Sequence, residues 1–319
     1  MKAIIGQDIN EASKWLMSDF PIAIPTETVY GLAANAFSES AVIKVFEAKD
    51  RPFFDPLIVH ISKEDDPNKY VSHIPEKAKM LAKRFWPGPL TLILPKKDII
   101  PDIVTSGQDT VGIRMPDHAL TQKLLSILPF PLAAPSANPF GYISPTMAEH
   151  VFDQLEQKIP YILDGGPAII GLESTIVGFE DDEPVVYRLG GIALEEIELV
   201  VGKLKMELNQ SSNPTAPGQL KSHYAPKKQV VIGDINTLID EYQGTDIAVI
   251  SFKDQYLNPR ISKNWVLSPD GNLAESAVNL FKALREADQS NATIIFTEVF
   301  PEKGLGRAIN DRLKRAATK

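Results

Sequence analysis

The 319-residue chain has 44% hydrophobic and 23% charged residues and a formal net charge of -8. Its length allows two domains that each bury a core of their own, and its composition is typical of soluble globular proteins. It has no cysteine, which excludes disulfides, cysteine nucleophiles and thiolate metal sites and suits a reducing compartment. The sequence shows neither a signal-peptide pattern nor an apolar run of the roughly 20 residues that cross a bilayer, so we expect a cytoplasmic protein without membrane contact.

The acidic balance also bears on nucleic acids. A protein that binds a duplex usually presents a basic face, because neutralising phosphates supplies most of its affinity. Here the one clear basic cluster lies near the end of the sequence, and we interpret it as the solvated last turns of a helix: Lys303, Arg307, Arg312, Lys314, Arg315 and Lys319. We therefore expect no stable nucleic-acid binding.

Short apolar runs alternate with amphipathic stretches through most of the chain. The pattern predicts strands at 21–27, 56–61, 90–95, 110–116, 131–138, 161–166, 174–179 and 184–190. Ser38 is placed to cap one helix, and a second helix over 75–86 should stop at Pro87. This alternation favours an α/β layer fold.

The composition changes at 206–228, where Ser, Asn, Pro and Gly are frequent and the apolar periodicity stops. We interpret this stretch as a linker between a first domain over 1–205 and a second domain over 229–319. The second domain has a Rossmann-like pattern, with strands at 229–234, 246–252 and 293–299 and helices at 237–243, 273–288 and 305–317. It has no G-x-G-x-x-G after a strand, so a dinucleotide site is not supported.

Four segments place polar side chains at the ends of predicted strands, where open α/β sheets bind ligands. They are PTETVYG at 25–31, KDRPFFDPLIVH at 49–60, APSANPFGYISPT at 134–146 and DGGPAIIGLESTI at 164–176. These segments are rich in hydroxyl groups, and several cations lie in them or follow other strands: Lys49, Arg51, Arg114 and Arg188. Hydroxyls and cations together suit a polyanion such as a nucleoside triphosphate.

Each of these signals alone has a simpler interpretation. Ser136 and Asn138 beside proline are ordinary turn residues, and Arg114 is compatible with a surface cation. His60 could be a satisfied, half-buried histidine, and Glu27 between two threonines could be a capping group. Only the combination of the segments points to a site.

Common nucleotide and hydrolase signatures are missing. Gly166 and Gly171 have the spacing of a P-loop, but Leu172 and Glu173 stand where Lys and Ser or Thr are required. There is no G-x-S-x-G elbow for an α/β-hydrolase. There is no H-E-x-x-H, and the five histidines are scattered, which disfavours a zinc enzyme.

Several motifs occur together in one order: PTETVYGL, K-x-R-P-x-x-x-P-L-I-V-H, WPGPLTLIL, VGIRMPDH, APSANP, GLESTIV and YRLGGI. With them the chain resembles the L-threonylcarbamoyladenylate synthase family over about residues 3 to 202. The HYAP stretch of the linker and the extra α/β domain are similar to the long, two-domain form of that family. The resemblance implies a YrdC-like twisted open-sheet domain, a linker over 206–228 that folds over the active site, and a smaller Rossmann-like α/β domain.

The resemblance also implies a role for each matching position. A polar tetrad in a basic cleft would consist of Lys49, Arg51, Ser136 and Asn138. L-threonine would be bound by Thr28, His60, Arg114 and Ser174, with its carboxylate on Arg114. ATP would be bound by Arg51, Asp55, Thr110, Ser136, Ser144, Arg188 and Tyr224.

The family's reaction joins L-threonine, bicarbonate or CO2, and ATP into threonylcarbamoyl-AMP and pyrophosphate. The resemblance therefore implies a nucleotidyltransferase that serves the t6A modification of tRNA and uses Mg2+ together with ATP. It also implies a threonylcarbamoyl-transferase machinery that receives the intermediate. No metal site made by the protein alone is expected.

Two departures and two alternatives accompany this interpretation. Ala134 stands where members often have Ser or Thr, so only its backbone can contact threonine, and Phe140 replaces a small residue. An RNA-binding module using the cationic cleft is the main alternative, although the chain lacks aromatic platforms interleaved with basic residues. A carbamoyl transferase of hydrogenase maturation has a similar domain, but its zinc-finger cysteines and acylphosphatase segment are missing here.

Overall fold

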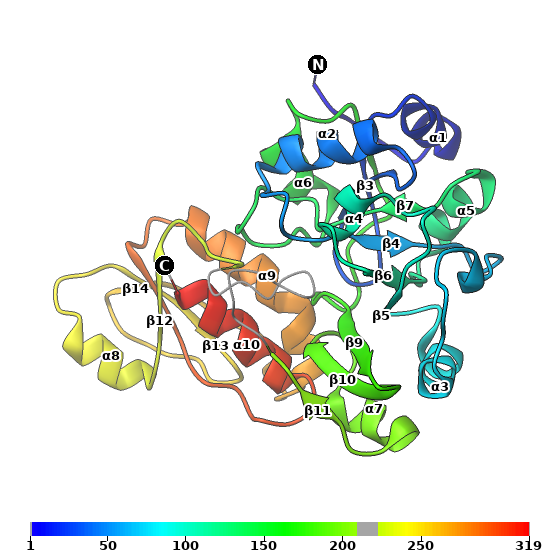
Figure 1. Cartoon of the computed structure of the whole chain (residues 1–319). Coiled ribbons are helices and arrows are strands. Elements are labelled where there is room, and N and C mark those ends of the chain that lie inside the picture. The colour runs from blue at the N-terminus through cyan, green and yellow to red at the C-terminus, as the bar shows by residue number, and fades with distance from the viewer. Residues whose placement is uncertain (1, 209–222, 319) are drawn as a thin grey trace.

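The computed structural model describes residues 2–208 and 223–318, and it contains two β-sheets with helices packed on them (Figure 1). An eleven-stranded sheet belongs to the first part of the chain and a four-stranded sheet to the second. This arrangement confirms the predicted α/β fold class. Among the described residues, no helix is both long enough and apolar enough to span a membrane.

The large sheet is mixed and carries the site. Its strands lie in the order β1 (Ile4–Gly6), β8 (Tyr161–Leu163), β2 (Ile22–Ile24), β3 (Gly31–Asn35), β7 (Leu132–Ala133), β4 (Ile58–His60), β6 (Thr110–Arg114), β5 (Leu90–Pro95), β9 (Thr175–Glu180), β10 (Glu183–Arg188) and β11 (Lys205–Met206). The central pair β4 and β6 is parallel and places His60 opposite Arg114. Residues far apart in sequence therefore meet where these two central strands end.

The helices of the first part are α1 (Ile9–Met17), α2 (Glu39–Lys49), α3 (Glu76–Phe85), α4 (Asp102–Thr105), α5 (Ala119–Ile127), α6 (Ala148–Leu155) and α7 (Leu194–Val201), with one 3-10 turn, η1 (Pro67–Lys69). As predicted, Ser38 caps α2: its hydroxyl accepts from the backbone N–H of Ala41. Helix α2 ends in a left-handed residue, Asp50, which turns the chain so that Arg51 enters the site. Helix α3 also ends where the proline stop predicts.

The four-stranded sheet is parallel, with the order β12 (Gln229–Ile232), β15 (Ile294–Thr297), β13 (Ile247–Ser251) and β14 (Ile261–Val266). Helix α8 (Ile235–Glu241) packs on one face, and α9 (Leu273–Gln289) and α10 (Gly306–Ala317) pack on the other. Helices on both faces of a parallel sheet are the Rossmann-like arrangement that the sequence predicts. Strand β14 is an element that the sequence patterns did not reveal.

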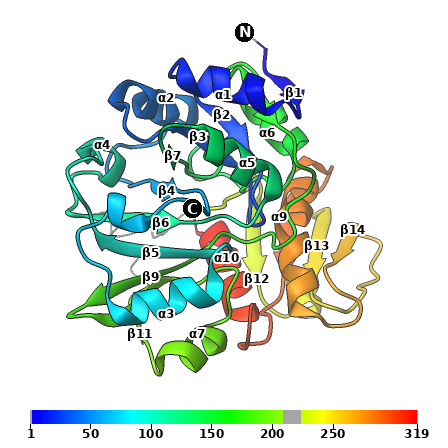
Figure 2. The same ribbon diagram turned by 90° about the vertical axis from the view of Figure 1, so that its right-hand side faces the viewer.

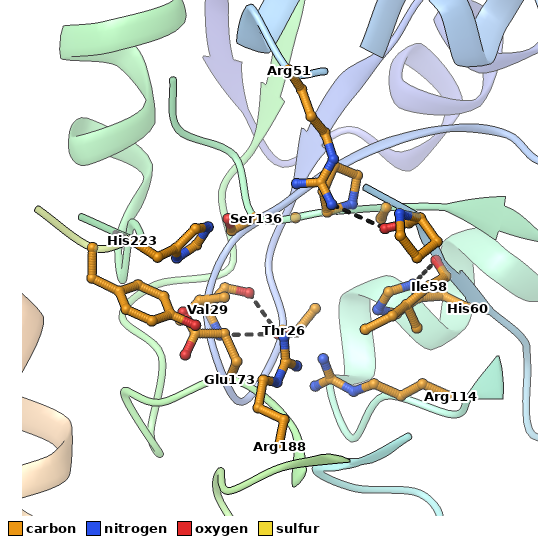
Figure 3. Close-up of a pocket in the computed structure, with 15 residues that line it drawn as sticks. Thr26, Val29, Arg51, Ile58, His60, Arg114, Ser136, Glu173, Arg188 and His223 are labelled. Atoms are coloured by element: carbon orange, nitrogen blue, oxygen red, sulfur yellow. Dashed lines mark hydrogen bonds between the residues drawn. The ribbon is translucent and has the colours of Figure 1, made fainter. Parts of the chain in front are cut away.

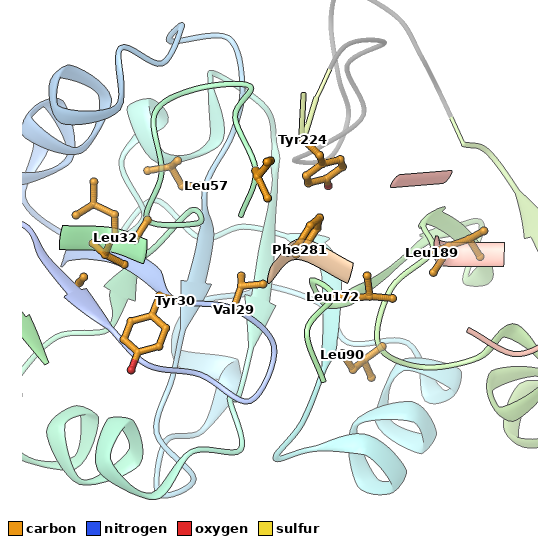
Figure 4. Packing of buried hydrophobic residues seen from close by; sticks show 14 of the residues in the cluster. Val29, Tyr30, Leu32, Leu57, Leu90, Leu172, Leu189, Tyr224 and Phe281 are labelled. Carbon is orange, nitrogen blue, oxygen red and sulfur yellow. The ribbon is translucent and has the colours of Figure 1, made fainter. Parts of the chain in front are cut away.

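Each part of the chain buries an apolar cluster of its own, and the two parts also share one. One continuous apolar cluster runs from the first domain into α9 and α10. Figure 4 shows its centre, where Tyr224 lies beside Phe281 of α9, with Leu172 and Leu189 of the first domain close by. The ring centroids of Tyr224 and Phe281 are 5.5 Å apart. A first domain cut free near residue 206 would expose this apolar surface.

The interpretation of the basic residues near the end of the sequence as solvated was wrong for Arg312 and Arg315, whereas Lys303 and Lys314 are exposed as expected. Helix α10 lies between the four-stranded sheet and the first domain (Figures 1 and 2). Arg312 is 0% exposed and Arg315 is 3% exposed. Arg312 pairs with the buried Glu173 of the first domain, and Arg315 pairs with Asp311 of its own helix.

The cap of α2 generates a stability prediction. Replacing Ser38 by Ala should lower the free energy of unfolding by about 1 kcal/mol, because the hydroxyl satisfies a helix N–H that has no other partner in the helix. Urea denaturation measures the loss. Ser40→Ala is the matched control, since both serines donate to the same Asp19 carboxylate but only Ser38 caps the helix. Equal losses in the two variants would contradict the capping role.

Candidate active site

A cavity opens in the large sheet where the central strands β4 and β6 end. Its walls come from the loop after β2, the ends of β4, β6, β7 and β10, the segment before β9, and the described end of the linker (Figure 3). It is lined by Thr26, Val29, Gly31, Arg51, Pro56, Ile58, His60, Arg114, Ala134, Pro135, Ser136, Glu173, Arg188, His223 and Tyr224. Seven predicted positions therefore gather here: Arg51, His60, Arg114, Ser136, Arg188, Tyr224 and, through its backbone position, Ala134.

Arg114 is held at the cavity by the loop that follows β2. Its guanidinium donates to Glu27 and to the hydroxyl of Thr28, each at 2.8 Å. Thr26 closes the loop, because its hydroxyl donates to the carbonyl of Val29 at 2.6 Å. Arg114 is only 4% exposed, so the surface-cation interpretation is wrong, and Glu27 is an ion-pair partner rather than a capping group.

Arg51 enters the cavity from the loop after α2. Its Nε donates to the carbonyl of Asp55 at 3.1 Å, one terminal nitrogen donates to that of Pro56 at 2.9 Å, and the same nitrogen lies 2.9 Å from the Asp55 carboxylate. The ring of Phe140 lies 5.8 Å from the guanidinium carbon, close enough for a cation–π contact. These contacts fix the direction of the cation.

Lys49 stands behind the cavity rather than in its wall. It is 1% exposed, and its ammonium donates to the carbonyls of Ser136 (2.6 Å) and Asn138 (2.5 Å). Burial, followed by the nearby Arg51 charge, lowers its pKa well below the usual value. Lys49 and Asn138 therefore support the loop that carries Ser136, whereas Arg51 and Ser136 line the cavity.

Arg188 and Ser174 form a second supported group. The Nε of Arg188 donates to the carbonyl of Ser174, and a terminal nitrogen donates to its hydroxyl, each at 3.0 Å. Next to them, the Glu173 carboxylate accepts from the hydroxyl of Ser144 at 2.6 Å. Ser174 and Ser144 are fully buried. Each is hydrogen-bonded to a residue that lines the cavity and does not line it itself.

Thr110 is the predicted position that lies farthest from this arrangement. It begins β6, whereas Arg114 ends it, so about 13 Å of strand separates them. Thr110 lines a small neighbouring cavity, and Pro56 belongs to the walls of both. Only a ligand that extends along the sheet past Pro56 would contact Thr110.

Several buried polar atoms at the cavity have no hydrogen-bond partner within the described part of the chain. They include one carboxylate oxygen of Glu27, Nε of Arg114, Nδ1 of His223 and the hydroxyl of Tyr224. Unsatisfied polar atoms are costly in a dry interior, and a polar ligand would relieve that cost. Burial raises the pKa of Tyr224 to about 12, so its hydroxyl keeps a proton to donate.

The sequence missed two contributors to the wall. Glu173 drew notice only as the residue that breaks a P-loop pattern, and Thr26 only as a neighbour of Glu27. His223 was noted beside Tyr224 in the linker and lies at the cavity with it. The rest of the linker, 209–222, lies outside the described residues.

Known proteins that are similar to this chain show the family to which it belongs. A telomere recombination family model matches residues 14–190, and a model named threonylcarbamoyl-AMP synthase, C-terminal domain, matches 192–318. The threonylcarbamoyl-AMP synthase of Pyrococcus abyssi is 42% identical, over 93% of this chain and 90% of the relative. The chain belongs to the threonylcarbamoyl-AMP synthase family.

Two further relatives support the membership. The synthase of Bacillus subtilis is 44% identical, over 97% of this chain and 92% of its own length. A crystal structure of P. abyssi Sua5 complexed with L-threonine has a TM-score of 0.93 and 40% identity, covering 99% of this chain and 98% of that one. This likeness confirms the YrdC-like domain followed by a second domain as the architecture of the family member described here.

Within 2–208 and 223–318, no group of three or more His, Asp or Glu side chains is arranged to hold a metal ion. Both carboxylate oxygens of Glu173 are already engaged, by Ser144 and by Arg312. Mg2+ in nucleotide sites is commonly bound by phosphates and water with one or two carboxylates.

Buried histidines generate a prediction about pH. Burial, reinforced by Arg114, lowers the pKa of His60 to about 3, and burial beside Arg51 lowers that of His223 well below 6.5. Burial also lowers the pKa of His150 to about 4. In the unfolded chain each titrates near 6.5, so the unfolded state takes up protons that the folded state refuses.

Stability should therefore be fully present above pH 6.5 and fall between pH 6.5 and 5, by up to about 1.4 kcal/mol per pH unit for each fully buried histidine. Urea denaturation across this range measures the slope. His150→Gln, outside the cavity, should make the slope shallower. A flat profile would contradict the buried, neutral state.

Proposed function

We propose that the chain synthesises L-threonylcarbamoyladenylate from L-threonine, bicarbonate or CO2, and ATP, with release of pyrophosphate. The likeness to a solved relative in complex with L-threonine, over nearly the full length of both chains, carries the proposal. The cavity supports it, because three buried arginines, Arg51, Arg114 and Arg188, line the same space.

The threonine end of the site would lie at Arg114. Its guanidinium, oriented by Glu27 and Thr28, can pair with the carboxylate of the amino acid. His60 stands opposite Arg114 on the neighbouring strand and is uncharged at neutral pH, so it adds no repulsion to the threonine amine. Ser174 would act through Arg188, to which its hydroxyl is bonded.

The nucleotide end would lie between Arg51 and Arg188. Both guanidiniums are held by neighbouring groups, and Ser136 and Tyr224 present hydroxyls to the same space. Lys49 and Asp55 would act by fixing Ser136 and Arg51, and Thr110 would contact only a nucleotide that extends past Pro56. Mg2+ bound to the phosphates would neutralise charge on them.

The reaction requires the protein to align the substrates more than to react covalently with them. The threonine amine adds to CO2 with loss of a proton, or to bicarbonate with loss of water, and an oxygen of the resulting carbamate attacks the α-phosphorus of ATP. The new P–O bond forms as the bond to pyrophosphate breaks, and the leaving pyrophosphate carries away the electron pair. Two anions must be brought together, and preorganised cations in a water-poor site lower that cost.

The product is a labile mixed anhydride, and its chemistry requires an acceptor enzyme. A threonylcarbamoyl-transferase machinery would receive it for the t6A modification of tRNA, and a cytoplasmic location is part of this proposal. Tyr224 and His223 lie at the cavity wall, where a linker folded over the site would limit the entry of water.

The function is tested by pyrophosphate release. We expect release that requires L-threonine and bicarbonate together, with threonylcarbamoyl-AMP detected by mass spectrometry. Omitting either substrate is the control. Release that is independent of threonine would overturn the proposal, and tight RNA retention that persists as salt is raised would favour the RNA-binding alternative instead.

Among the cations of the cavity wall, Arg51 is the one whose substitution should affect ATP use most directly. Arg51→Lys should fold normally and lower kcat/KM for ATP about 100-fold, because a lysine cannot keep the forked contacts of the guanidinium. Arg84→Lys on the exposed face of α3 is the control and should retain full turnover. Unchanged kinetics in Arg51→Lys would remove Arg51 from the nucleotide site.

A further inference from the structure

The C-terminal domain inserts one charged side chain into the wall behind the cavity. Arg312 of α10 is 0% exposed and is the largest fully buried side chain in the described chain. A guanidinium taken out of water costs several kcal/mol unless every nitrogen is matched. A buried arginine at a domain contact is therefore a candidate for a role beyond packing.

Each nitrogen of Arg312 has a partner at 2.8 Å. Nε donates to the Glu173 carboxylate, one terminal nitrogen to the carbonyl of Leu189, and the other to Asp311 on the same helix. Its guanidinium carbon also lies 5.0 Å from the ring centre of Tyr224. Glu173 and Tyr224 both line the cavity, and the ring of Tyr224 rests on Phe281 of the same domain.

The position of Glu173 decides what Arg188 can offer to a substrate. Both side chains line the same cavity (Figure 3). Burial opposes a charge on Glu173, but Arg312 and then Arg188 hold its pKa below the usual value, so it is a carboxylate at neutral pH. A carboxylate released from Arg312 would pair with Arg188, which would then be less able to bind a phosphate.

We propose that Arg312 is a positioning residue of the synthase: it draws the Glu173 carboxylate away from Arg188 and fixes the Tyr224 ring, so that the second domain completes the nucleotide end of the site. This inference rests on the proposed function. It assigns the C-terminal domain a part in ATP binding, although none of its own residues between 229 and 318 lines the cavity.

The test uses the full chain with Arg312→Met, Glu173→Gln and the double variant. We expect Arg312→Met to raise the KM for ATP at least about tenfold with a much smaller change in the KM for threonine. Adding Glu173→Gln should restore ATP binding in part, because the uncharged amide no longer competes for Arg188. Arg312→Lys, which keeps the charge, should lie between wild type and Arg312→Met.

Arg285→Met is the matched control. Arg285 is 3% exposed, comes from α9 of the same domain, and donates to Ile143 and Gln154 of the first domain, outside the cavity wall. It should lose thermal stability as Arg312→Met does, but keep the wild-type KM for ATP. Equal ATP affinity in Arg312→Met and Arg285→Met, or no recovery in the double variant, would overturn the proposal.

Calorimetric titration with a non-hydrolysable ATP analogue separates the two proposals. If the wild-type chain makes no threonine-dependent pyrophosphate, the proposed function fails, while the analogue still reports whether Arg312 sets nucleotide affinity. If Arg312→Met does not fold, the comparison is made with Arg312→Lys and with the double variant, in which neither member of the pair is charged. Analogue affinity that is unchanged in these variants would contradict the positioning role.

Discussion

Buried arginines are the constraint on which the rest of the structure depends. Four of them surround one cavity, each at most 7% exposed: Arg51, Arg114, Arg188 and Arg312. A bare guanidinium is not tolerated away from water, so each one has hydrogen-bonded partners, and those of Arg114, Arg188 and Arg312 include residues from other parts of the chain. The loop after β2, the segment before β9 and the helix α10 are thereby held to one another, and the cations are aimed before any substrate arrives.

This arrangement divides the site into two layers with different tasks. The inner layer touches the cavity and includes Arg51, Arg114 and Arg188. The outer layer includes Lys49, which holds backbone carbonyls, and Glu27, which holds a cation. A substitution in the outer layer should therefore affect both folding and function, because it leaves a buried group of the inner layer without its partner.

The sequence was sufficient for much of the fold and for the inner layer. The cap at Ser38, the stop of α3 and most strands are local signals, and the ordered motifs brought distant strand ends together. The failures share one physical cause. Arg312 and Glu173 neutralise each other as a buried pair. Because they are 139 residues apart, no local sequence pattern shows the pairing. The charge pattern of α10 is that of a surface helix, because burial of its arginines depends on partners that lie in another domain.

The single apolar cluster that joins the two domains has a consequence for how the protein is made. A domain emerging first from the ribosome normally folds on its own, but here part of its apolar surface packs against α9 and α10, which are made later. At about 5–20 residues per second, the roughly 100 residues that follow the first domain take about 5 to 20 s to appear. During that interval the nascent chain exposes this apolar surface to solvent, as folding intermediates that require chaperones do.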